Sequence, residues 1–264
     1  MVRDAGVAVE VIPTTGPGHA VALSRAFAAQ GYDRVVVWGG DGTINEVAGP
    51  LIHSQTILGI VPGGSGDGLA HSLGLPRDVS AAGKAALTAP ARAVDVGYFG
   101  SRHFLNVAGA GFDAEVAARF NRRTSRGVRG YVSECLKAVW SYRCATYDVT
   151  TEDETLLGPR FVVAFANGRE YGNGLVLVPN ADPLDGRLDM VAVAHGSALM
   201  QFWRARRLAW RRLAPAAGVH RARVKGAVIQ GARIRCHVDG EPFDASGRIE
   251  VRLAPGALRV AGVA

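Results

Sequence analysis

The sequence predicts a chain of two parts, an N-terminal doubly wound α/β domain followed by a C-terminal antiparallel β-sandwich. Three observations support this fold class. Strand-like and helix-like segments alternate up to about residue 95, short strand-like runs dominate after it, and two glycine-rich loops follow strand-like segments of the first part. A length of 264 residues is comfortable for two domains, and 48% hydrophobic residues with 34 glycines fit a globular protein.

The first part covers residues 1–95. Apolar β-branched runs predict strands, and amphipathic runs predict helices. The predicted strands are residues 7–13, 35–38 and 57–61, and the predicted helices are residues 19–30, 44–51, 69–73 and 79–87. This alternation favours a parallel sheet, in which ligands bind at the carboxyl ends of the strands. Both glycine-rich loops lie at such ends, so we expect them to face one crevice.

The second part covers residues 96–247 and consists mainly of short strands. They are predicted at 94–99, 104–108, 147–151, 161–166, 175–178, 188–194, 228–230, 233–238, 247–253 and 257–260. Two predicted helices, at roughly 113–143 and 197–213, interrupt them. Several short strands at regular spacing indicate an antiparallel sandwich or barrel.

Composition indicates the cellular compartment of the protein but does not identify what it binds. The three cysteines form no CxxC pair and no metal-ligand spacing, which suits a reducing cytoplasm. No apolar run approaches the roughly 20 residues of a membrane-spanning helix. The formal charge is +7, with arginines gathered at 119–129 and 204–212. On charge alone, nucleic acid, anionic lipid and phosphorylated substrates all stay open.

The first glycine-rich loop lies within residues 35–47, VVVWGGDGTINEV. A buried strand that ends in glycines and enters a helix directs free N–H groups and the positive end of the helix dipole at one point. That arrangement suits a phosphate. Asp41 adds a carboxylate, which an anion site would reject unless a metal ion or a transferable proton were present. The loop therefore predicts nucleotide chemistry.

The second loop, residues 62–70, repeats this pattern with the hydroxyl of Ser65 and three exposed-backbone glycines. Either loop alone is explained as well by a tight strand–helix turn. Two such loops at adjacent strand ends favour a phosphate site. Neither loop is a P-loop, and neither carries the dinucleotide fingerprint GxGxxG.

Two acidic segments belong to the second part. Residues 180–189 place three aspartates in a turn, which is either an ordinary turn or a site for Mg²⁺ or Ca²⁺ with oxygen ligands. Asp239-Gly240-Glu241 lies at a predicted strand end. It is either a plain hairpin turn or the place where Glu241 acts as general base toward an alcohol.

These motifs occur in the order and spacing of a known family. They are GGDGTINEV at 39–47, PGGSGDGLAHSLGLP at 62–76, VPNADPLDGRLD at 178–189 and VDGEPF at 238–243, with TTGPGHA at 14–20, FLNVAGAGFDAEV at 104–116, RGYVSECLKAV at 129–139 and ANGREYGNGLVLVP at 166–179. Over nearly its whole length the chain resembles the diacylglycerol kinase catalytic family, which includes bacterial lipid kinases, diacylglycerol kinases, and sphingosine and ceramide kinases.

The resemblance implies a fold and a reaction. The fold is a nucleotide-binding domain like that of NAD kinases and phosphofructokinases, followed by a lipid-binding β-sandwich, with a last segment at about 248–264 returning to the first domain. The reaction is transfer of the γ-phosphoryl group of ATP to a lipid hydroxyl, with Mg²⁺ as cofactor. The preferred acceptor is diacylglycerol, which would give phosphatidic acid.

Carried over position by position, the resemblance also implies roles for residues. Glu241 matches the proton acceptor of bacterial members, and Asp41 belongs to a Mg²⁺–water network or acts as the base, as in sphingosine kinases. Asp185, with the carbonyls of Asp182 and Arg187, matches a structural Mg²⁺ site. The implied nucleotide-binding residues are Thr14, Gly39, Gly40, Asp41, Gly42, Thr43, Ile44, Asn45 and Ser65.

Two features depart from the family pattern. The usual first strand and NPxSG loop, which help to hold ATP, do not precede TTGPGHA, so we expect either a start upstream of Met1 or impaired ATP binding. Asp67 stands where the family usually has Asn. A negative charge there is expected to weaken the binding of ATP phosphates unless a cation compensates.

The second basic segment, residues 199–213 (LMQFWRARRLAWRRL), places Trp and Leu at helical spacing with arginines on other faces. Packing in a core or docking on anionic membrane both explain it. We expect a cytoplasmic protein, peripheral at the inner face of the membrane, with no nucleic-acid partner because no nucleic-acid-binding module accompanies the arginines. A homodimer stays open.

Three alternatives to a diacylglycerol kinase remain. The acceptor could be a sphingoid base or another lipid alcohol. The chain could be an NAD or polyphosphate-type kinase, although the predicted sandwich argues for lipid. It could also be a catalytically impaired lipid- or nucleotide-binding protein, because the N-terminal ATP loop is missing.

Overall fold

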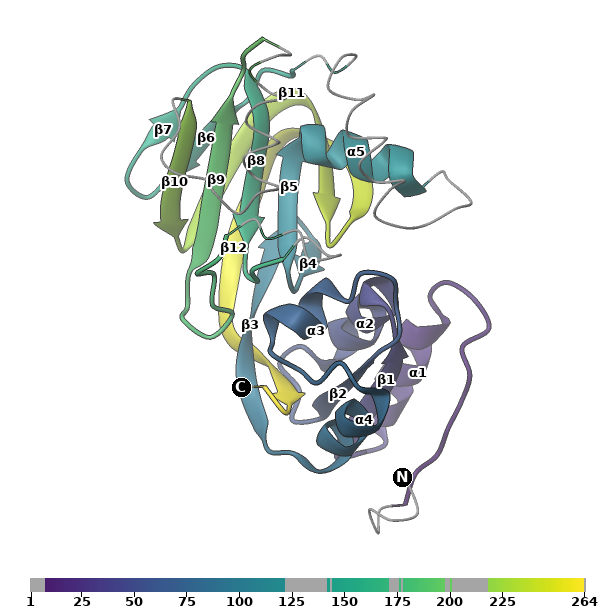
Figure 1. Cartoon of the computed structure of the whole chain (residues 1–264). Helices are drawn as coiled ribbons and strands as arrows, with labels where there is room; N and C mark the ends of the chain where they lie inside the picture. The colour runs from purple at the N-terminus through teal and green to yellow at the C-terminus, as the bar shows by residue number, and fades with distance from the viewer. Residues whose placement is uncertain are drawn as a thin grey trace.

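The computed structural model describes residues 8–121, 142, 144–170, 176, 178–197, 200 and 218–263. An α/β unit built from the first part lies at one end and a unit of antiparallel strands at the other (Figure 1). Two strands, β3 (Ala91–Phe99) and β12 (Glu241–Ala261), run from one unit into the other. The predicted fold class, an α/β domain followed by a β-sandwich domain, is confirmed.

The α/β unit follows the predicted alternation closely. Its elements are α1 (His19–Ala29), β1 (Arg34–Gly39), α2 (Asp41–Ala48), the 3₁₀ turn η2 (Gly49–Leu51), β2 (Ile57–Pro62), α3 (Gly68–Ser72) and α4 (Val79–Thr88). Strands β1 and β2 are parallel, with Val35 opposite Leu58. Both strands therefore end at the same edge of the sheet, where the two glycine-rich loops begin.

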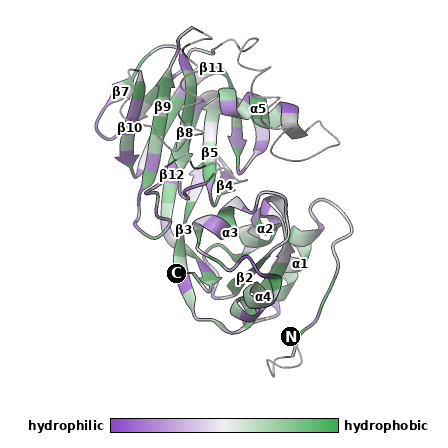
Figure 2. Ribbon diagram, in the orientation of Figure 1, coloured by the Kyte–Doolittle hydropathy of each residue, from purple (hydrophilic) through white to green (hydrophobic). Residues whose placement is uncertain are grey.

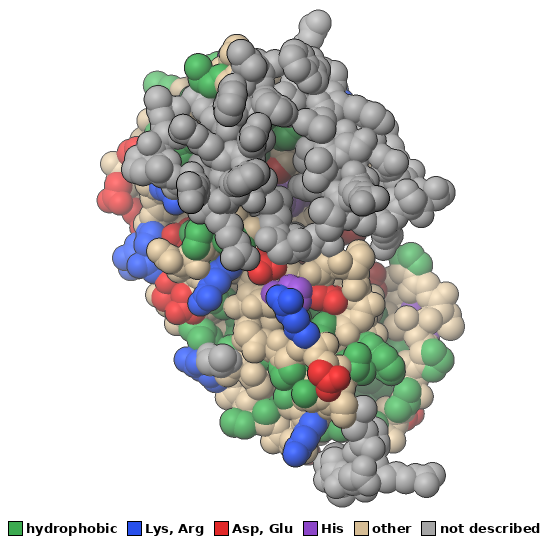
Figure 3. Space-filling model, in the orientation of Figure 1, with side chains coloured by type: hydrophobic (Ala, Val, Ile, Leu, Met, Phe, Trp, Pro, Cys, Tyr) green, Lys and Arg blue, Asp and Glu red, His purple; other side chains and the backbone are tan. Residues whose placement is uncertain are grey.

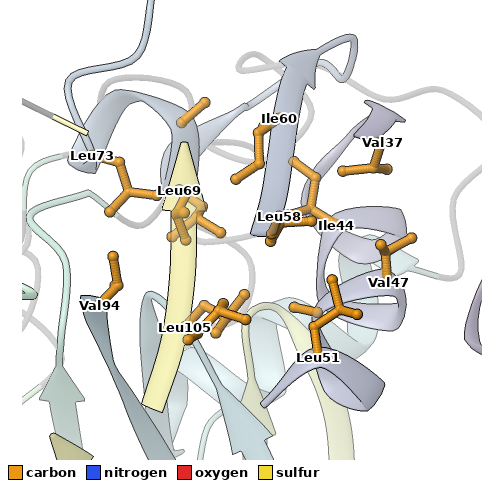
Figure 4. Packing of buried hydrophobic residues seen from close by; sticks show 14 of the residues in the cluster. Val37, Ile44, Val47, Leu51, Leu58, Ile60, Leu69, Leu73, Val94 and Leu105 are labelled. Carbon is orange, nitrogen blue, oxygen red and sulfur yellow. The ribbon is translucent and has the colours of Figure 1, made fainter. Parts of the chain in front are cut away.

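The core of this unit forms between the sheet and α1–α3. Ile44 and Leu51 reach it from the α2–η2 segment, and Leu58 and Ile60 reach it from β2; all four are buried. Figure 4 shows these side chains converging on β12, which enters the unit from the sandwich. The helix that opens at the first glycine-rich loop is therefore fixed by its buried face.

The strand predicted at residues 7–13 is wrong for the part that the structure describes. Residues 8–15 form neither helix nor strand, and Val9, Val11 and Ile12 are exposed. An alternating apolar run is strand-competent, but its backbone needs a partner strand to satisfy its hydrogen bonds. Among the described residues, no strand pairs with this segment.

The second unit is a set of antiparallel strands. They are β3, β4 (Arg102–Phe104), β5 (Val107–Gly111), β6 (Asp148–Thr151), β7 (Thr155–Leu156), β8 (Arg160–Ala166), β9 (Leu188–Ala194), β10 (Val219–Val224), β11 (Gly226–Val238) and β12, with helix α5 (Phe112–Asn121) after β5. The main path of hydrogen-bonded strands is β1-β2-β12-β11-β5-β8-β9-β10. Apolar residues concentrate on these strands (Figure 2).

Some predicted strands were divided or joined incorrectly. The runs 228–230 and 233–238 belong to one strand, β11, with a register shift between Gly231 and Ile234. The runs 247–253 and 257–260 both belong to β12, with a shift between Ala254 and Leu258. The run 104–108 instead divides between β4 and β5. The predicted helix 197–213, apart from residues 197 and 200, lies outside the described residues, and so do residues 175 and 177 of the predicted strand 175–178.

The junction between the units is built on Asp95 in β3. This carboxylate is buried and accepts hydrogen bonds from the N–H groups of Gly186 and Gly256, each at 2.7 Å. The Asp95 N–H donates to the carbonyl of Pro183. One side chain thus ties the acidic turn after residue 180 to both crossing strands.

Candidate active site between the two units

The first glycine-rich loop leaves backbone donors open. Gly39 ends β1, and Gly40 is the N-cap of α2 without a side chain that could cap the helix. The Ile44 N–H donates to the Gly40 carbonyl at 3.0 Å, which closes the first helical turn. The N–H groups ahead of Ile44 lack intrahelical acceptors, and together with the helix dipole they make the start of α2 a candidate anion site.

The second loop packs directly on the first. The Gly63 N–H donates to the Gly39 carbonyl at 3.1 Å. A Cβ added to Gly64 would lie 2.7 Å from the Gly40 Cα, closer than carbon atoms approach. Glycine at position 64 is therefore required for the two loops to touch, and a Cβ on Gly40 would come to a tight 3.1 Å from the Gly64 Cα. The two loops lie side by side, as predicted; that they face one crevice stays a prediction.

Asp41 turns its carboxylate toward the second loop. Its oxygens accept hydrogen bonds from the N–H groups of Gly68 and Leu69, both at 3.1 Å. Burial raises the pKa of Asp41 above its usual value, and the charges of Asp239 and Asp67 raise it further, while the two N–H bonds act in the opposite direction. Asp41 is a carboxylate whose negative charge is only partly compensated.

Asp67, the residue that departs from the family pattern, forms a hydrogen bond within the second glycine-rich loop. It lies in the left-handed region at φ 46°, and its Oδ1 accepts from the Gly64 N–H at 2.8 Å. The carboxylate therefore fixes the glycine that touches the first loop. The predicted weakening of ATP binding by this charge stays a prediction.

Asp239 has a structural role at the site that the sequence analysis did not predict. Its Oδ2 accepts from the Asn45 side chain and the Leu105 N–H, each at 2.8 Å. Its Oδ1 accepts from the N–H groups of Asn106 and Val107 at 2.9 and 3.0 Å. The carboxylate thus joins α2 of the α/β unit to the β4–β5 connection of the sandwich. The sequence signals were an aspartate in a turn and its place in the VDGEPF motif, and neither identified these partners.

Glu241 follows Asp239 across a tight hairpin. Val238 pairs with Glu241, and Asp239 and Gly240 both have positive φ, 45° and 84°, as a type I′ turn requires. The hairpin turn suggested by the sequence is therefore confirmed. The Glu241 side chain is exposed, on a turn that Asp239 holds against α2. Its carboxylate is therefore open to solvent, two residues from the aspartate that contacts α2.

The other predicted nucleotide-binding residues have different surroundings. The Ile44 side chain is fully buried and available to no ligand, and the Asn45 amide is bonded to Asp239. Thr43 packs against Gly39. Ser65 is exposed on the second loop, and Thr14 is exposed in the segment before α1.

The predicted metal turn is held by hydrogen bonds and an arginine. Asp182 accepts from the Leu184 N–H at 3.1 Å, and Asp185 accepts from the Arg187 N–H at 2.9 Å. The second oxygen of Asp185 forms an ion pair with Arg223. Within the described part of the chain, no three acidic, histidine or cysteine side chains gather as metal ligands. The predicted site, one carboxylate with the carbonyls of Asp182 and Arg187, stays a prediction, and Arg223 competes for its carboxylate.

This acidic turn also lines a cavity of about 410 Å³ with Arg221 and Arg223 of β10. Acidic and basic side chains lie next to one another on the described part of the molecular face in Figure 3. Of the first arginine cluster, Arg119 pairs with Glu115; the remaining arginines of both clusters lie outside the described residues. No described helix is long and apolar enough to cross a membrane.

Together, the geometry defines a class of protein: a two-unit fold with open backbone N–H groups at a helix N-terminus on one side of a junction and an exposed carboxylate on the other. The diacylglycerol kinase catalytic domain family matches residues 1–99, and the family described as the YegS C-terminal NAD kinase beta sandwich-like domain matches residues 106–262. The chain belongs to this family of lipid kinase-like proteins.

Named relatives agree with this assignment. A "probable lipid kinase YegS-like" from Chromohalobacter salexigens is 36% identical over 76% of this chain and 66% of its own length. A protein of the same name from Pseudomonas aeruginosa PAO1 is 30% identical over 98% of this chain and 86% of its own length.

Solved structures show the same fold. A diacylglycerol kinase from Bacillus anthracis is similar with a TM-score of 0.76 at 19% identity, covering 98% of this chain and 87% of that one. An NAD kinase from Archaeoglobus fulgidus in complex with ATP is similar with a TM-score of 0.56 at 12% identity, covering 99% and 86%.

Proposed function

We propose that this protein transfers the γ-phosphoryl group of ATP to the hydroxyl of a lipid alcohol. One observation carries the proposal. Asp239 fixes the turn that bears Glu241 against α2, the helix whose N-terminus forms the anion site. An accessible base and a phosphate site therefore share one junction. Phosphoryl transfer depends mainly on such positioning and on charge neutralisation.

In the proposed reaction the lipid hydroxyl oxygen attacks the γ-phosphorus. The new oxygen–phosphorus bond forms as the bond from the γ-phosphorus to the bridging oxygen breaks, and ADP leaves with that electron pair. The hydroxyl proton passes to the Glu241 carboxylate, which acts as general base. The open N–H groups at the start of α2, with those of the second loop, hold the transferred phosphate.

The residues at Asp41 fit a magnesium ion that arrives with ATP. Mg²⁺ in kinases is usually held by one or two carboxylates plus phosphate oxygens and water. Asp41 supplies a carboxylate beside the start of α2 that accepts only two hydrogen bonds from described residues. When bound, the ion would neutralise charge on the phosphates. Asp41 itself stays fixed by the N–H groups of Gly68 and Leu69.

Diacylglycerol is the acceptor that we propose, with phosphatidic acid as product. Family membership supports a lipid alcohol, and the names of structural relatives point to diacylglycerol. A panel of diacylglycerol, a sphingoid base and a monoacylglycerol, presented in mixed vesicles with radiolabelled ATP, separates the candidates. We further propose that the protein is cytoplasmic and takes its lipid at an anionic membrane surface, which a vesicle-sedimentation assay tests.

Glu241→Gln tests the chemistry. The side chain is exposed, so the variant should keep the stability and ATP affinity of the parent while turnover falls at least about 100-fold, the usual range for loss of a general base. Glu250→Gln, an exposed glutamate of the same strand, is the matched control and should keep full turnover. Equal turnover in Glu241→Gln and the parent would refute the role of Glu241.

A further inference from the structure

An exposed tryptophan stands at the edge of the candidate nucleotide site. Trp38 is the last side chain of β1 before the glycines, and 71% of it is exposed. Its strand neighbours Val35 and Val37 point into the core, whereas Val36 and Trp38 point to the opposite face of the sheet. An indole so open to water is unusual, because a large apolar ring normally gains free energy from burial.

The indole lies against the second glycine-rich loop. A Cβ added to Gly63 would come within 2.9 Å of the Trp38 Cδ1 atom and 3.0 Å of its Nε1 atom. Glycine at position 63 therefore leaves the space that the five-membered ring occupies. The rest of the ring system stays accessible next to the loop.

Only two glycines separate Trp38 from the start of α2 along the chain. Gly39 and Gly40 continue from Trp38 into the helix, and Gly63 and Gly64 lie beside them. No side chain of these four residues separates the indole from the N–H groups that we assign to phosphate. A ligand with phosphates at α2 can extend over these glycines to an aromatic ring.

We propose that Trp38 is the platform on which the purine base of the nucleotide stacks. This inference rests on the proposed function and names the group that recognises the base, as distinct from the phosphates. A flat π-system offers a base a stacking surface with little sequence or ring specificity, so adenine and guanine nucleotides should both gain from it. The phosphate chain gains nothing from the indole.

The test compares ATP with inorganic tripolyphosphate, which has the phosphates and no base, on the full chain. Trp38→Ala should weaken ATP binding about tenfold, in line with the usual contribution of base–aromatic stacking, and leave tripolyphosphate binding unchanged. Trp38→Phe should keep ATP binding within about threefold, and the change in tryptophan fluorescence that ATP causes in the parent should disappear. Val36→Ala, on the same face of β1 and farther from the loops, is the control.

Two results overturn the inference while leaving the proposed function intact. One is unchanged ATP affinity in Trp38→Ala. The other is an equal loss of ATP and tripolyphosphate affinity, which would show that the indole only supports the loop. A third result, a parent chain that binds neither ATP nor tripolyphosphate, overturns the proposed function and this inference with it. Melting temperatures of all variants exclude a folding defect as the cause.

Discussion

Asp41 and Asp239 belong to opposite sides of the junction, and their hydrogen bonding differs in one respect. A carboxylate offers about four acceptor positions. Asp239 receives four hydrogen bonds, from the Asn45 side chain and three consecutive backbone N–H groups. Asp41 receives two from described residues, the N–H groups of Gly68 and Leu69. One carboxylate is saturated and the other keeps acceptor capacity.

In the proposed function, this difference separates Asp239, which positions the turn, from Asp41, which would face the ligand. All the acceptor positions of Asp239 serve to join α2 to the sandwich, so little remains for a substrate. Asp41 has burial without full compensation, and its raised pKa records that imbalance. Perturbed carboxylates of this kind are characteristic of functional sites, where a bound cation or proton completes the compensation. The comparison predicts a different response of each region to substitution.

The largest effect is expected at Asp239. Asp239→Ala leaves three backbone N–H groups and the Asn45 amide without their acceptor, and each unsatisfied buried donor costs about 1–3 kcal/mol. With partial rescue by water, the free energy of unfolding should fall by about 3–5 kcal/mol, measured by urea denaturation. Glu241→Gln, two residues away and exposed, should change it by less than about 0.5 kcal/mol. A similarly small change in both variants would refute the role of Asp239 in joining α2 to the sandwich.

The second effect concerns the contact between the loops. In Gly64→Ala the new Cβ would lie 2.7 Å from the Gly40 Cα and 2.8 Å from the Asp67 Oδ1, so the loops must separate. We expect a loss of about 1–3 kcal/mol in unfolding free energy, typical of overpacking, with weaker ATP binding. Gly42→Ala is the matched control for the unfolding free energy alone, because its Cβ would meet nothing within 4 Å. Isothermal titration with ATP and urea denaturation measure both quantities.

The alternation of strands and helices was predictable because each element carries its own periodicity. The errors arose where pairing, not local pattern, decides the structure. Residues 8–13 alternate as a strand does but have no partner among the described strands. Strand β12 was divided because Pro255-Gly256 reads as a turn, whereas in the sheet it makes a register shift inside a strand that continues.

The residues of the candidate site, too, were predictable only where local sequence identified them. Asp41 stands in a glycine-rich loop, so local sequence identified it. Asp239 is separated from Asn45 by 194 residues, and from the three N–H groups that it accepts by 132 to 134. No local pattern contains those partners, and the dipeptide Asp-Gly indicates only a turn. The ion pair of Asp185 with Arg223 likewise joins residues 38 apart, which local reasoning about a metal turn did not include.

The third effect is the pH dependence that Asp41 contributes. Because its pKa in the folded protein is raised above the usual 3.8, the folded state holds this proton to higher pH than the unfolded state does. The resulting contribution to stability is present at low pH and is lost as pH rises through the folded-state pKa. The unfolding free energy of the parent relative to Asp41→Asn should therefore fall as the pH rises from below 3.8 through the raised pKa of Asp41. A rise over that interval would contradict the assignment of incomplete compensation.

The smallest effect should come from a third carboxylate, Asp185, whose free oxygen is taken by Arg223. If the arginine occupies the place of a cation, the parent protein should have the same unfolding free energy in millimolar magnesium as in EDTA. Arg223→Gln frees the oxygen, and magnesium should then stabilise the variant by about 0.4 kcal/mol when its concentration equals the dissociation constant. Arg221→Gln, the neighbouring arginine of the same cavity, should stay insensitive to magnesium. A parent chain that EDTA destabilises would instead place a metal at this turn, and Asp185 would then belong with Asp41 among the carboxylates left open for a ligand.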